Sequence, residues 1–118
     1  MHVIWEEAVA DAAASNTRGN AMDENLICII DSGYIAGLPN LGADAIAGEV
    51  TVAAHEEGGI CVREGAEDRI GHGTAVLDII NRHTKGAKYF IIKIFEEELS
   101  AEEELFLFAL RYVCDHVP

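Results

Sequence analysis

Two short motifs in this chain carry side chains that can do proton-transfer chemistry. Asp31 ends an apolar run and opens the triplet Asp-Ser-Gly at residues 31–33, and His72 lies within Gly-His-Gly-Thr at residues 71–74. An ionised carboxylate can fix the tautomer of an imidazole, and that imidazole can then take a proton from a hydroxyl group. Asp31 and His72 are therefore candidates for the acid and the base of a catalytic triad.

The elements around the two residues predict that they meet. Residues 25–30 form a continuous, β-branched-rich apolar run, which is typical of a strand buried on both faces of a parallel sheet. From residue 73 the apolar period becomes helical and Gly86 is placed to end the helix. Asp31 is then at the carboxyl end of a strand and His72 at a helix entrance. In open α/β sheets ligands bind beyond these strand ends, so we expect the two groups within hydrogen-bonding reach.

The other strands and helices expected from the sequence indicate an α/β fold. Residues 1–24 read as a surface lead-in, with a helical stretch over 6–14 followed by a polar stretch, and residues 25–118 as the domain itself. Short strands are expected at 49–53 and 59–63 and a buried one at 89–95. Ser100 has the S-x-x-E form that caps a helix reaching about residue 115. We predict a parallel sheet with flanking helices, in three αβα layers.

Composition narrows the classes of partner. The chain has 118 residues, 50% of them hydrophobic, and a formal net charge of −13, which suits one packed domain. That charge repels phosphate backbones and anionic lipids, so we expect no nucleic-acid or membrane partner and favour basic peptides or cations. The glutamate runs at 96–98 and 102–104 are expected on solvated surfaces. No basic segment leading into an apolar stretch opens the sequence, and we expect a cytoplasmic protein.

The cysteines and the other histidines predict no metal or cofactor. Cys28, Cys61 and Cys114 are scattered and odd in number, without a C-x-x-C pair, so reduced thiols are expected. His55, His83 and His116 have no partners at ligand spacing. They are interpreted as ordinary surface or core residues.

The order and context of the two motifs resemble those of the subtilisin-like serine peptidases, or subtilases. The shared features are a strand running into D-S-G, then D-x-x-G-H-G-T beginning at Asp68 and leading into a helix, then a strand that ends near Lys93. The resemblance covers about residues 26–115. It implies that residues 25–118 are the N-terminal part of a subtilase-like catalytic domain, with a partial subtilase-like sheet, Asp31 as the triad acid and His72 as the base. Calcium occurs in many members, so a calcium site is left open by the resemblance alone.

The chain also departs from the family pattern. Family members usually have Ala-Gly where this helix has Leu77 and Asp78, so a charged Asp78 must find a partner or solvent. The family's oxyanion-hole asparagine and its G-T-S-x-A nucleophile motif lie further along than this sequence extends. Ser15, Ser32 and Ser100 match neither position. Ser32 adjoins the acid, and Ser100 is better explained as a helix cap.

Two hypotheses from different classes follow. In the first, this chain is a segment of a serine endopeptidase that acts on peptides or proteins, inactive alone and completed by a serine from another segment or chain. In the second, it is a non-catalytic module that grips an extended peptide along its sheet edge, or that self-associates as a homodimer to cover that edge and the apolar helix over 105–113. The second predicts peptide binding that does not depend on Asp31 or His72.

Overall fold

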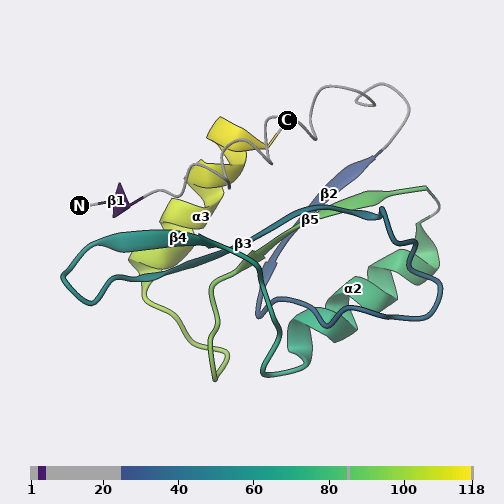
Figure 1. Ribbon diagram of the computed structural model, residues 1–118, viewed down its shortest axis with the longest axis horizontal. Helices are drawn as coiled ribbons and strands as arrows, with labels where there is room; N and C mark the ends of the chain where they lie inside the picture. The colour runs from purple at the N-terminus through teal and green to yellow at the C-terminus, as the bar shows by residue number, and fades with distance from the viewer. Residues whose placement is uncertain (1–2, 5–24, 85, 118) are drawn as a thin grey trace.

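The computed structural model describes residues 3–4, 25–84 and 86–117. They form an α/β fold in which a mixed, mostly parallel sheet is flanked by helices (Figure 1). Across the sheet the strands follow the order β1-β4-β3-β5-β2. The elements are β1 (Val3–Ile4), β2 (Leu26–Asp31), β3 (Ile46–Ala54), β4 (Ile60–Glu64), α2 (His72–His83), β5 (Lys88–Lys93) and α3 (Glu103–His116).

The predicted α/β fold with a parallel sheet is confirmed, with one antiparallel pair of strands that the sequence analysis did not expect. β2, β5 and β3 run parallel, but β3 and β4 are antiparallel. Only the tight turn at residues 55–59 joins these two strands, and Gly58 and Gly59 both have positive φ there. A parallel neighbour needs a crossover of a dozen or more residues, so a connection this short forces a hairpin. Val3 and Ile4, from the expected lead-in, add β1 alongside β4.

Two hydrophobic clusters give the fold its three layers. One contains Tyr112 and Ala109 of α3 with the β3, β4 and β5 side chains of one sheet face. The other contains Leu77 of α2 with Ile29 and Ile91 from the opposite face. Figure 1 shows α2 and α3 on either side of the sheet. The αβα arrangement expected from the sequence is therefore present.

Strand β5 lies between β3 and β2 and brings the ends of β2 and β5 to a common edge of the sheet. Its residues from Tyr89 to Lys93 are all buried, and its register pairs Asp31 with Lys93 across the ladder to β2. The Asp31 carbonyl accepts a hydrogen bond from Ile94 N–H at 2.8 Å, which fixes the last residue of β2 beside the exit of β5. This edge is where the candidate site lies.

The helix ends differ in part from expectation. α2 begins at His72, as predicted, and ends at His83, before Gly86. The predicted capping box at Ser100 is wrong. The N-cap of α3 is Glu102, which makes no side-chain capping hydrogen bond. Ser100 N–H instead donates a hydrogen bond to Glu98 O in the preceding turn. Glu103 and Glu104 in the first turn interact favourably with the helix dipole in place of a hydroxyl cap.

The helix expected over residues 6–14 lies outside the described residues. Within the part of the chain that the structure does describe, neither helix has the length and apolar character needed to cross a membrane.

Candidate functional site

The structure brings Asp31 and His72 together at the shared strand edge. His72 Nδ1 lies 2.9 Å from Asp31 Oδ1 and 3.0 Å from Oδ2. A carboxylate can only accept, so Nδ1 carries the ring proton and its N–H donates a hydrogen bond to Asp31. The Asp31 side chain is 12% exposed and the His72 side chain 50% exposed. The second ring nitrogen, Nε2, is thus left to act as a base, and backbone donation from Ser32 N–H to Asp31 Oδ1 at 2.7 Å holds the carboxylate in place.

Two motif glycines permit this approach. Gly33 has φ +103°, and a Cβ there would lie 2.2 Å from Ala66 O. A Cβ on Gly73 would lie 2.2 Å from Gly33 O. Both distances are far shorter than any real carbon–oxygen contact, so the first turn of α2 packs directly on the backbone after β2 only because side chains are absent. This close packing places the His72 imidazole within hydrogen-bonding distance of the Asp31 carboxylate.

Asp68 organises the turn that leads into α2. Its carboxylate accepts hydrogen bonds from the N–H groups of Ile70, Gly71 and Thr74 and from the hydroxyls of Thr74 and Ser32. Asp68 is only 6% exposed. Burial by itself raises its pKa, but the opposing hydrogen bonds, that from the Thr74 hydroxyl first, hold the pKa of the carboxyl well below its usual range.

Ser32 has a structural role at this site. Its hydroxyl donates to Asp68 Oδ1 at 2.8 Å and accepts from Gly73 N–H at 2.8 Å, and the residue has no exposed surface. A hydroxyl committed in both directions and shielded from solvent is not a nucleophile. Ser32 instead connects the end of β2 by hydrogen bonds to the Asp68 turn and to the first turn of α2. This agrees with its expected non-nucleophilic role.

The loop that carries Asp68 is also fastened to the sheet. Glu49 on β3 accepts a hydrogen bond from Tyr34 OH at 2.6 Å and another from Ala66 N–H at 3.2 Å. Buried Lys93 on β5 donates to Glu67 O at 2.6 Å. Burial, then hydrogen bonding to Glu49, raises the pKa of Tyr34, so its hydroxyl stays protonated as a donor. Both motif loops are therefore attached to rigid strands.

Sequence reasoning found the pair but not this support. Asp68 appeared only as the first letter of the longer motif, and Glu49 not at all. A usable signal existed for Asp68: an aspartate followed by backbone donors two, three and six positions later is the pattern of a turn organised by its own carboxylate.

The charged Asp78, expected to need a partner or solvent, forms an ion pair with Arg82 at 2.7 Å.

Because of the Asp68 carboxylate, the free energy of unfolding should decrease at acidic pH. Its pKa is lowered in the folded state, so its contribution is complete above the ordinary aspartate value near ~4 and is lost as pH falls below it. Asp68→Asn should lower the free energy of unfolding at neutral pH by about 2–3 kcal/mol. It should also reduce the loss of stability that accompanies the fall in pH. Urea denaturation between neutral and acidic pH measures both effects. Asp44→Asn, at an exposed loop position, is the matched control. Equal pH profiles for the Asp68 variant and the unmodified chain would contradict this role.

No other grouping in the described residues indicates a cofactor. Within them, no three or more His, Cys, Asp or Glu side chains are placed to hold a metal ion. His55 accepts a hydrogen bond from Glu57 N–H within its turn, and His83 is exposed at the end of α2. All three cysteines are free, and burial raises the pKa of the Cys28 thiol to about 11, which keeps it protonated and unreactive.

A scan against protein-family models and searches of curated proteins and of solved structures found no match to this chain.

Proposed function

We propose that this chain supplies the acid and the base of a subtilisin-like serine endopeptidase and that a serine from another segment or chain completes the triad. The observation that carries the proposal is the pair itself: a largely buried carboxylate 2.9 Å from His72 Nδ1, with the imidazole half exposed. The motif order around Asp31, Asp68 and His72 supplies the family. The chain by itself should not hydrolyse peptides.

The chemistry is acyl transfer in two halves. His72 Nε2 takes the proton of the serine hydroxyl as its oxygen bonds to the substrate carbonyl carbon, and Asp31 stabilises the imidazolium that forms. His72 then gives that proton to the leaving amine as the peptide C–N bond breaks, which leaves an acyl-enzyme. Water, activated by the same imidazole, releases the acid and restores the serine. Asp31 stays ionised throughout.

The direct test is to supply the nucleophile. The 118-residue chain is co-expressed with a segment carrying G-T-S-x-A and an asparagine-bearing strand, and cleavage of fluorogenic peptides is measured together with labelling by a fluorophosphonate. We expect cleavage and serine labelling in the assembly and neither in the chain alone. An assembly that forms but is inert, or whose activity survives loss of His72, would defeat the proposal.

A second candidate, a non-catalytic peptide-binding module of the same fold, is favoured by one observation. The two hydroxyls near the pair, those of Ser32 and Thr74, are both committed to Asp68. No hydroxyl among the described residues is therefore poised beside His72 Nε2. This candidate predicts that peptide binding by the chain alone is unchanged in Asp31→Asn, whereas the first predicts lost cleavage in the completed assembly.

A further inference from the structure

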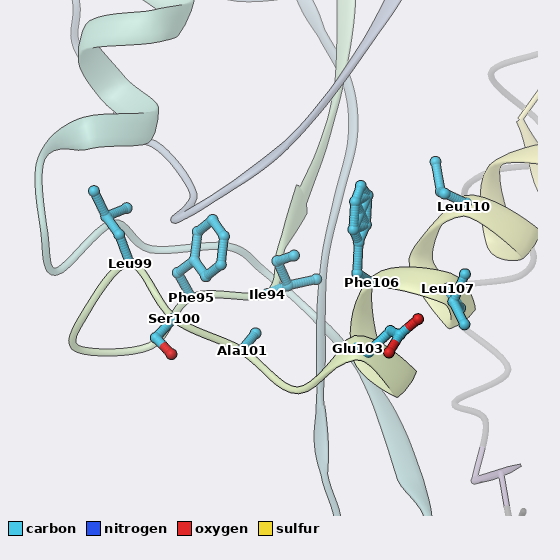
Figure 2. Close-up of a pocket in the computed structure, with 9 residues that line it drawn as sticks. All are labelled: Ile94, Phe95, Leu99, Ser100, Ala101, Glu103, Phe106, Leu107 and Leu110. Carbon is cyan, nitrogen blue, oxygen red and sulfur yellow. The ribbon is translucent and has the colours of Figure 1, made fainter.

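An apolar groove lies between the loop after β5 and the first turns of α3. Its volume is about 600 Å³, within the range of known ligand pockets. Figure 2 shows Phe95 and Leu99 from the loop on one side of Ile94, and Phe106 and Leu110 from the helix on the other. Leu99, Phe106 and Leu110 are each 44–50% exposed. Large apolar side chains gathered and exposed in this way mark a binding surface rather than ordinary scatter.

A second hollow adjoins the groove and is acidic. It shares Ile94, Ser100 and Ala101 with the groove and is lined by the glutamates at 96–98. Glu96 is neutralised by Lys93 and Arg63, and Glu97 lies 3.8 Å from Arg69. Glu98, which lines this hollow, and Glu103, which lines the groove, have no cation within ion-pair distance among the residues described. Negative charge therefore remains uncompensated beside both hollows.

We propose that this surface binds a peptide segment that places apolar side chains in the groove and lysine or arginine side chains against the acidic rim. The apolar side chains of the peptide supply affinity because binding removes their surface from water. The uncompensated carboxylates favour peptides with lysine or arginine and speed association. Two copies of this chain, each with a net charge of −13, would instead bring like charges together at the rim. The proposal goes beyond the catalytic one, because it requires neither a nucleophile nor peptide cleavage.

The test uses the 118-residue chain and three labelled peptides of equal length, followed by fluorescence anisotropy. The first peptide alternates leucine with lysine and arginine, the second replaces the basic residues by glutamate, and the third replaces the leucines by serine. We expect the first to bind at least about tenfold more tightly than either other peptide, and to lose affinity as salt is raised.

Matched variants locate the binding. Glu98→Gln with Glu103→Gln should weaken the first peptide about fivefold, whereas Glu56→Gln with Glu57→Gln, which removes the same charge from the β3–β4 turn, should change it by less than about twofold. Leu107→Ser in the groove should weaken it similarly, and Ile79→Ser on α2 should not, although both side chains are 57% exposed. Circular dichroism and thermal melts check that all four variants fold.

Several results would overturn the proposal. These are equal affinity for the basic and acidic peptides, equal effects of groove and control variants, or no binding of any peptide at low salt. Sedimentation showing a dimer that Leu107→Ser dissociates would assign the groove to a second copy. Displacement of the peptide by the serine-bearing segment would assign it to that segment. Failure here leaves the catalytic test unaffected, because that test measures cleavage and serine labelling.

Discussion

Replacing His72 by alanine is expected to lower peptide cleavage by the serine-completed assembly about 10⁴-fold or more, because its imidazole is the group that moves the proton between the serine and the leaving amine. Asp31→Asn should cost about 10⁴-fold in kcat, since an amide at this position can present N–H to Nδ1 and so favour the wrong tautomer. The effect should fall on kcat and leave KM nearly unchanged, because neither change alters peptide docking.

His83→Ala provides the control, because this histidine is exposed at the far end of the same helix. Its assembly should cleave at the unmodified rate. The double variant of Asp31 and His72 should lose no more than His72→Ala alone, since the two residues act as one unit. Independent, multiplicative losses would contradict the proposed coupling through the hydrogen bond.

Gly73→Ala should destabilise the fold by about 3 kcal/mol or more, an overpacking cost at the upper end for one added methyl group. The new Cβ would lie 2.2 Å from Gly33 O, a backbone atom that cannot move without shifting the end of β2. The sign is informative, because alanine at an open helical position would instead stabilise by about 1 kcal/mol. Urea denaturation measures the difference.

Gly42→Ala is the control for this substitution. Gly42 lacks a positive φ, and its added Cβ would meet only an Asp44 side-chain oxygen at 3.4 Å. Its free energy of unfolding should change by less than about 1 kcal/mol. If Gly73→Ala were neutral or stabilising, α2 would not pack on the backbone after β2 as described, and the placement of His72 would lose its support.

The meeting of Asp31 and His72 was predictable because each residue occupies a position that its sequence context determines. A β-branched apolar run fixes Asp31 at a strand end, and a change to helical period fixes His72 at a helix entrance. The parallel ladder between β2 and β5 places Asp31 at this edge, and the turn after β4, with Gly73 packed against the Gly33 backbone, places His72 there. This prediction needed only the end of the apolar strand run and the start of the helix to be identified correctly.

The supporting contacts were not predictable in the same way. Glu49 reaches Tyr34 and Ala66 because of the β3 register, which depends on packing across the sheet rather than on local pattern. The capping box failed at Ser100 because the preceding turn, closed by its own backbone bond to Glu98, leaves Glu102 to cap α3. The β3–β4 hairpin, by contrast, was recoverable from the short connection between the two strands.

The claim that Asp31 orients His72 is tested most directly by the protonation of the imidazole itself. Nitrogen chemical shifts of ¹⁵N-labelled histidine in the 118-residue chain, recorded where the ring is neutral, report which nitrogen carries the proton. The geometry predicts that Nδ1 is protonated and Nε2 bare, and that Asp31→Asn abolishes this preference. A proton on Nε2 in the unmodified chain, or the same tautomer with and without the Asp31 carboxylate, would contradict the account.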